Sequence, residues 1–307
     1  MQNSRYYSLN EFLRSRHGEK ILKLSIDAGF TCPNRDGTIS SKGCLFCSER
    51  GSGDFTFYEK GSITAQLQEA SLLLANKWGT NRKYIAYFQA FTNTYDSIET
   101  LRLKYEEALH FPGVVGLAIA TRPDCLTDEI IEYLSELNKR THLWVELGLQ
   151  TIHEETALLI NRGYNLSCFE EAMQKLAAHH IETVVHLILG LPYETHEQML
   201  DSVRYISKLP LQGVKLHMLH ILDNAPLGDY YTKHPFPLLT QEEYVRLIGE
   251  ILPILPSEFV IHRLTGDGAR AHLIAPLWTI HKKTVLNHIT QYLNSHNIYQ
   301  GKSLNKY

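Results

Sequence analysis

Short runs of apolar residues alternate with amphipathic stretches through most of this chain. The runs are nearly continuous in apolar residues, which is typical of strands that are covered on both faces of a parallel sheet. They lie at residues 20–28, 84–91, 114–122, 142–150, 182–190 and 213–222. The pattern therefore predicts six strands, one after each amphipathic stretch.

Helix signals lie between these runs. In residues 63–74, the apolar side chains of Ile63, Leu67, Ala70 and Leu74 fall on one helical face. Capping boxes indicate where further helices begin, because a short polar side chain and an acidic or amide side chain three residues later satisfy the first backbone N–H groups. The boxes pair Ser8 with Glu11, Asp96 with Glu99, Ser167 with Glu170, Thr195 with Gln198, and Thr240 with Glu243.

Repeated strand–helix units with short loops predict a parallel sheet with right-handed crossovers. About six units fit a partial or full α/β barrel, or a doubly wound sheet, and both gather ligands at the carboxyl ends of their strands. After residue 222 the pattern changes to a loop rich in Pro and aromatic residues, a helix (241–252), a strand (258–265) and a helix (283–295). We expect a core at residues 1–222 and an α/β extension at 223–307.

Composition and charge narrow the class of protein. The chain is 44% hydrophobic and 21% charged, as globular proteins are. It has no apolar run of about 18 residues and no apolar stretch near its start, which predicts a cytoplasmic protein without a membrane partner. Lys and Arg outnumber Asp and Glu by 8 to 5 in residues 1–50 and by 6 to 1 in residues 261–307. Basic ends can bind a polyanion, or they can simply be solvated.

Three of the five cysteines, Cys32, Cys44 and Cys47, stand in one loop after the first expected strand. In a reducing compartment, clustered thiols indicate metal binding rather than disulfides. Three thiolates leave one iron of a four-iron cluster open to another ligand. Structural zinc takes four protein ligands, for which His17 is a candidate. Spacing alone leaves an iron cluster, a zinc site and unliganded thiols open, while Cys125 and Cys168 are expected to be packing thiols.

Seven segments of the chain together carry a resemblance to a known group of enzymes. They are IDAGFTCPNRDG (26–37), YFQAFTNTY (87–95), ATRPDCL (120–126), ELGLQT (146–151), LGLPYET (189–195), KLHMLH (215–220) and RLTGDG (263–268). They resemble the YhcC/YtqA-type radical S-adenosylmethionine (SAM) proteins, a subgroup akin to the radical SAM part of the Elongator catalytic subunit. The eleven residues between the first two cysteines depart from the usual three but are the rule in this subgroup.

The resemblance implies a partial TIM-like (β/α)6 barrel in which the three cysteines hold a [4Fe–4S] cluster and the fourth iron binds SAM. One electron, from a donor such as flavodoxin or ferredoxin, would cleave SAM to methionine and a 5′-deoxyadenosyl radical. The resemblance also implies tRNA as the substrate, with carboxymethylaminomethyl converted to aminomethyl at C5 of the wobble uridine. A radical SAM enzyme for a small anionic metabolite and a zinc-bearing RNA-binding module remain as alternatives.

Polar and turn-forming residues near the expected strand ends are candidates for cofactor contacts. Gln89, Thr92 and Asn93 replace the glycine-rich segment that usually meets the amino group of SAM, and a carboxylate on a strand suits the ribose hydroxyls. The cofactor candidates are Phe46, Gln89, Thr92, Asn93, Glu146, Gln150, Gly190 and Pro192. Each also has a structural interpretation, such as turn formation, loop packing or a paired charge in the barrel.

Two further groups are candidates for substrate chemistry. Arg122 could grip a carboxylate or pair with Asp124, and the histidines and lysine on the last two strands could bind substrate or move protons. The catalytic candidates are Arg122, His186, Lys215 and His217, and the candidates for RNA or substrate binding are Arg263, Asp267, Arg270, Lys282 and Lys283. Period two predicts that Lys215 and His217 share one face of the strand and His220 lies on the other.

Overall fold

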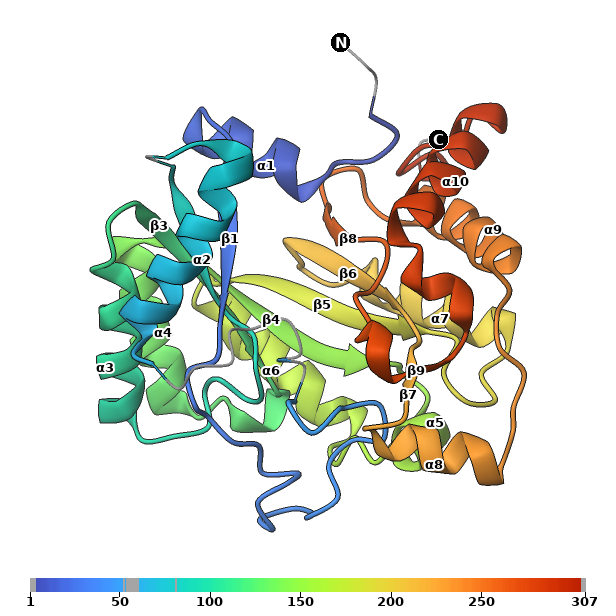
Figure 1. The fold of residues 1–307 in the computed structure, drawn as a ribbon, viewed down its shortest axis with the longest axis horizontal. Helices are drawn as coiled ribbons and strands as arrows, with labels where there is room; N and C mark the ends of the chain where they lie inside the picture. The colour runs from blue at the N-terminus through green and yellow to red at the C-terminus, as the bar shows by residue number, and fades with distance from the viewer. Residues whose placement is uncertain (1–3, 52, 54–60, 81, 305–307) are drawn as a thin grey trace.

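A curved sheet of seven parallel strands forms the centre of the computed structural model, which describes residues 4–51, 53, 61–80 and 82–304 (Figure 1). In order across the sheet, the strands are β1 (Leu22–Ile26), β2 (Tyr84–Phe88), β3 (Val114–Thr121), β4 (His142–Gln150), β5 (Glu182–Leu189), β6 (Gly213–Met218) and β8 (Val260–Arg263). The first six lie within the six predicted runs, and the partial barrel is confirmed.

The predicted strand 213–222 is wrong as a single element. The chain leaves the sheet after Met218, and β7 (Ile221–Leu222) pairs with β9 (Leu273–Ala275) in a separate antiparallel sheet. The apolar pattern continues through the break because Leu219 and Ile221 enter another hydrophobic cluster, beside Leu191 and Leu227. The predicted strand 258–265 is β8, which pairs with β6, so the extension adds a seventh strand to the expected six. The division of the chain at residue 222 remains a prediction.

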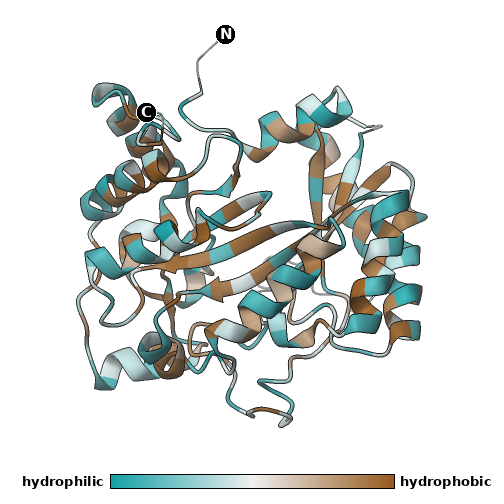
Figure 2. Ribbon diagram, turned by 180° about the vertical axis from the view of Figure 1, so that it is seen from behind, coloured by the Kyte–Doolittle hydropathy of each residue, from teal (hydrophilic) through white to brown (hydrophobic). Residues whose placement is uncertain are grey.

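The described residues form ten α-helices. Figure 2 shows that the strands are largely hydrophobic and that the helices carry hydrophilic residues along part of their surface. The helices are α1 (Leu9–His17), α2 (Ile63–Trp78), α3 (Ile98–Leu109), α4 (Asp128–Arg140), α5 (Glu154–Leu159), α6 (Leu166–Ala178), α7 (His196–Ile206), α8 (Pro226–Lys233), α9 (Gln241–Ile251) and α10 (Lys282–Ser295). Among them, none combines the length and the apolar character that are needed to cross a membrane.

Three predicted capping boxes are confirmed, at Ser8, Thr195 and Thr240. Two are wrong by one or two residues. Ser97 caps α3 by accepting a hydrogen bond from the backbone of Thr100, while Asp96 accepts from Ser97. Asn165 caps α6 instead of Ser167. Both regions hold two good acceptors next to each other, so the box pattern cannot decide which one begins the helix.

The two faces of the sheet have separate hydrophobic cores. Successive residues of β4 alternate between them, since Val145 and Leu147 belong to the large core with the helices, whereas Trp144 belongs to a small inner cluster. That inner cluster contains Leu13 of α1 and the early strand residues Ile85 and Val184. Apolar packing therefore fills the concave side near the amino ends of the strands, and polar residues line it further along.

The two edge strands, β1 and β8, do not pair with each other, and the segment before α1 lies along β8. Ser8 forms a parallel bridge with Ile261, and the amide of Ile261 donates to the carbonyl of Tyr7 (2.8 Å). The side-chain oxygen of Gln300 accepts from the backbone amide of Tyr7 (2.9 Å), and the backbone amide of Gln300 donates to the carbonyl of Arg5 (2.9 Å). Residues near the two ends of the chain are thus joined at this edge of the barrel.

Candidate active site

The cysteine loop follows β1 and is fastened to the segment after α5. The Asn161 side chain donates to the carbonyl of Gly43 (2.6 Å), and the Asn34 amide donates to the carbonyl of Asn161 (2.6 Å). The same Asn34 amide lies 3.4 Å from the Cys44 sulfur. Arg35 crosses the loop and donates to the carbonyl of Cys47 (3.0 Å). These contacts hold the loop in one shape around its thiols.

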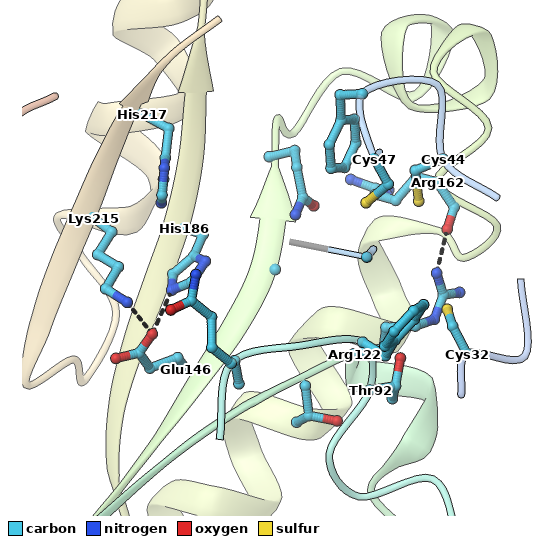
Figure 3. Close-up of a pocket in the computed structure, with 18 of the residues that line it drawn as sticks. Cys32, Cys44, Cys47, Thr92, Arg122, Glu146, Arg162, His186, Lys215 and His217 are labelled. Carbon is cyan, nitrogen blue, oxygen red and sulfur yellow. Dashed lines mark hydrogen bonds and ion pairs between the residues drawn. The ribbon is translucent and has the colours of Figure 1, made fainter. Parts of the chain in front are cut away.

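Cys32, Cys44 and Cys47 line one cavity of about 160 Å³ at the carboxyl ends of the strands (Figure 3). A hydrogen bond from Cys47 lowers the pKa of Cys44 to about 7, against the effect of burial, and Arg122 and Arg35 add to the lowering. The pKa of Cys47 is raised, chiefly by the same hydrogen bond and by burial. An enclosed set of three thiols that already favours a thiolate fits a cluster ligated by three cysteines.

His17, the candidate fourth ligand of a zinc site, lies elsewhere. Its Nε2 is 3.1 Å from Nδ1 of His142, the first residue of β4. The cysteines lie beyond the opposite, carboxyl ends of the strands, so His17 does not complete a four-ligand site with them.

Arg122 lines the same cavity, and its guanidinium donates three hydrogen bonds. Its Nε and Nη2 donate to the two oxygens of Asp124 (2.9 and 2.7 Å), and Nη1 donates to the carbonyl of Arg162 (2.9 Å). The structure thus forms the expected pair with Asp124, and because the guanidinium still lines the cavity, a contact with a carboxylate ligand stays a prediction. Its charge faces Cys44 and favours a thiolate there.

Arg162 is a site residue that the sequence analysis missed. It is 1% exposed, and its Nη1 donates to the carbonyls of Leu149 (3.0 Å) and Thr151 (2.7 Å), just beyond β4. It anchors the end of that strand to the cavity. Its Nη2 also lies 3.4 Å from Glu154, but most of its partners are backbone carbonyls, so no side-chain motif marks it in the sequence.

Several cofactor candidates come together here, and others do not. Phe46, Gln89, Thr92, Glu146 and Gln150 all line the cavity. Asn93 instead donates to the carbonyls of Phe88 (3.1 Å) and Ala120 (2.8 Å), which ties β2 to β3. Asn93, Gly190 and Pro192 are outside the lining of this cavity and of its neighbour described below. Their cofactor contacts remain predictions.

A buried ionic cluster lies on the far wall of the cavity from the cysteines (Figure 3). Glu146 is fully buried and accepts from Lys215, from His186 Nε2 (3.0 Å), from Trp144 Nε1 (3.0 Å) and from Lys23 (3.4 Å). Burial alone would raise the pKa of Glu146, but the charges of the two lysines hold it well below its usual range. The carboxylate is ionised, and a ribose contact would have to displace one of these donors.

A second cavity of about 290 Å³ adjoins the first. The two share Phe46, Cys47, Gln89, Gln150, His186, His217 and Arg263, and the second extends to His220 and the loop 266–268. The face predicted for His220 is wrong, because the strand ends at Met218 and the chain turns the ring into this cavity. Gly266 and Gly268 flank the ring closely, since a Cβ on either would lie 2.4 or 2.3 Å from it.

Two imidazole nitrogens in this second cavity are buried and unpartnered within the described residues, Nε2 of His217 and Nε2 of His220. Burial lowers the pKa of His217 well below its usual range and that of His220 to about 4. Both rings are therefore neutral at pH 7, and the cavity offers uncharged hydrogen-bonding groups.

The RNA candidates are spread over a wider area. Asp267 bridges Arg263 (3.0 Å) and Lys282 (2.7 Å), so the charges of these two cations are partly neutralised. Arg263 lines both cavities, whereas Arg270, Lys282 and Lys283 lie outside them. Arg270 and Lys283 are exposed on the extension.

Comparisons with known proteins agree over most of the chain. Residues 32–206 match the model of the Radical SAM superfamily, and residues 211–295 match the Radical_SAM C-terminal domain. The uncharacterized protein YtqA of Bacillus subtilis is 46% identical over 97% of this chain and 92% of its own length. Protein YhcC of Escherichia coli is 35% identical, with coverage of 96% and 94%.

More distant similarities cover the fold or a part of it. The solved structure of Elp3 from the archaeon Methanocaldococcus infernus, with an N-terminal deletion, has a TM-score of 0.69 and 17% identity, and covers 91% of this chain and 64% of that one. The tRNA uridine(34) acetyltransferase of Dehalococcoides mccartyi is 26% identical over 56% of this chain and 37% of its own length.

Proposed function

This chain belongs to the radical SAM superfamily, and from that premise we propose that it is a tRNA-modifying enzyme acting on the C5 side chain of the wobble uridine. The expected conversion is of carboxymethylaminomethyl to aminomethyl. The observation that carries the proposal is the similarity of about half of the chain to a tRNA uridine(34) acetyltransferase. The basic ends of the chain support an RNA partner.

Cys32, Cys44 and Cys47 would hold a [4Fe–4S] cluster in the first cavity. When bound, and reduced by a donor such as flavodoxin or ferredoxin, such a cluster would supply the electron for reductive cleavage of SAM. The protein keeps the cysteine loop in place through Asn34 and Arg35, and it encloses the site between that loop and the strand ends. Enclosure matters because a reactive radical must be kept from solvent.

The remaining site residues divide between the two partners in this proposal. Phe46, Gln89, Thr92 and Gln150 lie close to the cysteines and would contact SAM. Lys283 and Arg270, which are exposed on the extension, would contact phosphates of the RNA. Asp267 would hold Arg263 and Lys282 in position between these regions.

Nucleoside mass spectrometry of tRNA from a deletion strain tests the proposal. Loss of the gene should deplete aminomethyl-type wobble uridines and accumulate the carboxymethylaminomethyl form. Complementation with the wild-type gene should restore the pattern, and complementation with Cys44→Ala should not. Unchanged wobble nucleosides, with the gene product confirmed absent, would refute tRNA as the substrate and favour a small anionic metabolite.

The zinc-bearing RNA-binding module makes a different and simple prediction. Anaerobically purified protein with an iron–sulfur cluster is brown and absorbs near ~400 nm, whereas a zinc protein is colourless. Colourless protein with one zinc ion per chain would refute the proposed enzyme.

A further inference from the structure

Two Glu–His pairs join β4 to β5, one at the amino ends of the strands and one near their middle. His142 Nε2 lies 3.1 Å from Glu182, and His186 Nε2 lies 3.0 Å from Glu146. In both pairs the partners are forty positions apart in the sequence. Of the two pairs, only Glu146–His186 reaches a cavity: Glu146 lines the first cavity, and His186 lines both. The same type of contact therefore occurs twice between these strands, and the Glu146–His186 pair is the one that faces the candidate active site.

The hydrogen bond fixes the protonation of the His186 ring. Glu146 is ionised by its two lysine partners, so its oxygens can only accept hydrogen bonds. Nε2 of His186 must therefore carry the proton. Burial, with the charge of Lys215, lowers the pKa of His186 to about 4. The ring is neutral at pH 7, and its other nitrogen, Nδ1, carries a lone pair.

That lone pair is available to a ligand. Within the described residues the structure gives Nδ1 no hydrogen-bond partner, and it is absent from the set of buried, unpartnered atoms. The side chain of His186 is 17% exposed and lines both cavities. Its ring centre is 5.2 Å from that of His217, on the next strand. The acceptor thus lies at the junction of the two cavities, across from the cysteines (Figure 3).

We propose that Nδ1 of His186 is a fixed hydrogen-bond acceptor for the substrate, and that it recognises an N–H or O–H group bound at the junction of the two cavities. The proposal rests on the proposed function, under which the donor is an N–H of the modified wobble uridine. Glu146 acts as a positioning residue, because it sets the tautomer. The charged and titratable groups near His186 are Glu146 of β4, Lys215 and His217 of β6, and Lys23 of β1. Arg263 of β8 lines the same two cavities.

Two substitutions separate the roles of the two ring nitrogens. The terminal oxygen and nitrogen of Asn are the same number of bonds from Cα as Nδ1 of His. The terminal atoms of Gln are the same number of bonds from Cα as Nε2. His186→Asn therefore keeps an acceptor toward the substrate and gives up the Glu146 contact. His186→Gln keeps the contact with Glu146 and gives up the acceptor.

The experiment measures equilibrium binding to the holoenzyme without reductant, so that no turnover occurs. The probe is an anticodon stem-loop RNA that carries 5-carboxymethylaminomethyluridine. We expect His186→Gln to weaken binding about tenfold, the usual cost of an unpaired buried donor, and His186→Asn to stay within about threefold of the wild type. His142→Gln, in the matched outer pair, should leave binding unchanged. Histidine ¹⁵N spectra of the holoenzyme should show His186 protonated at Nε2.

The outcomes distinguish this inference from the function on which it rests. Wild-type affinity in His186→Gln, or a His186 ring protonated at Nδ1, would overturn the acceptor role while leaving the tRNA proposal intact. A wild-type holoenzyme that does not bind the RNA would overturn the proposed function, and with it the ligand named here.

Discussion

The buried cluster around Glu146 allows one strong prediction about stability. Glu146→Gln keeps the shape of the side chain but leaves Lys215 and Lys23 without their shared counter-charge. Removing one partner of a buried ion pair typically costs about 3–5 kcal/mol of unfolding free energy. The geometry agrees, because a single pair at 3.4 Å attracts by about 5 kcal/mol at an effective dielectric constant of about 20, before desolvation is subtracted.

Part of this cost depends on pH. Burial lowers the pKa of Lys215 below its ordinary value, so in Glu146→Gln the lysine can give up its proton in the folded state. A base whose pKa is lower in the folded than in the unfolded state gains relative stability as the pH rises toward its unfolded value. The loss in Glu146→Gln should therefore shrink between pH 7 and pH 9, while the wild type changes less.

A double-mutant cycle with Lys215→Met isolates the pair. Urea unfolding of the wild type, the two single variants and the double variant should give a coupling energy of about 2–4 kcal/mol, because the double variant no longer holds an unpaired charge between the two positions. The control cycle is Glu106→Gln with Arg140→Met, an exposed pair with contacts of 2.7 and 3.1 Å. Its coupling should be about 1 kcal/mol or less. Equal coupling in both cycles would refute the reasoning.

Four further predictions concern other parts of the chain. Replacing any one of the three loop cysteines by Ala should abolish bound iron in anaerobic protein, whereas Cys125→Ala should keep it; iron assays decide. Gly268→Ala should cost about 1–3 kcal/mol in urea unfolding, because its Cβ would meet the ring of His220 at 2.3 Å. Unfolding free energy should fall as the pH drops from 6.5 to 4, by up to about 3 kcal/mol for His220, whose pKa burial lowers to about 4, and His220→Gln should reduce that fall. Lys283→Glu should weaken RNA binding and flatten its salt dependence more than Lys282→Glu, whose charge is already paired with Asp267; unchanged salt slopes would contradict this.

The sequence predicted the order of the strands because buried parallel strands leave an unmistakable apolar pattern. It did not predict where the run 213–222 breaks, since residues on both sides of the break are buried in different clusters. The same limit applies to β8, which was expected in the extension but pairs with β6. The local pattern of apolar residues predicts that a segment is buried, but it does not predict which other element packs against that segment.

The candidate site also has parts that the sequence predicted and parts that it did not. Three cysteines in one loop are a local signal, and they line one cavity as expected. Arg162 was missed because it binds mostly backbone carbonyls, and Lys23 was missed because its partner Glu146 is 123 positions away. Glu146 was singled out as a carboxylate in an apolar strand, but its four donors come from four strands, its own and three others. Such a cluster depends on which strands become neighbours across the barrel.

The contact between the first residues and β8 also has a consequence for the order of folding during synthesis. The carbonyl of Tyr7 leaves the ribosome early, and its partner, the amide of Ile261, follows about 250 residues later. At about 5–20 residues per second, the first segment waits roughly 13–50 s for the strand that it covers. In that interval β1 can pair with β2, but β6 lacks its neighbour β8, and the first residues lack the strand that they contact. Docking of the first residues on β8 is therefore among the last events in the synthesis of this protein, and a stalled ribosome would present an incomplete sheet to chaperones.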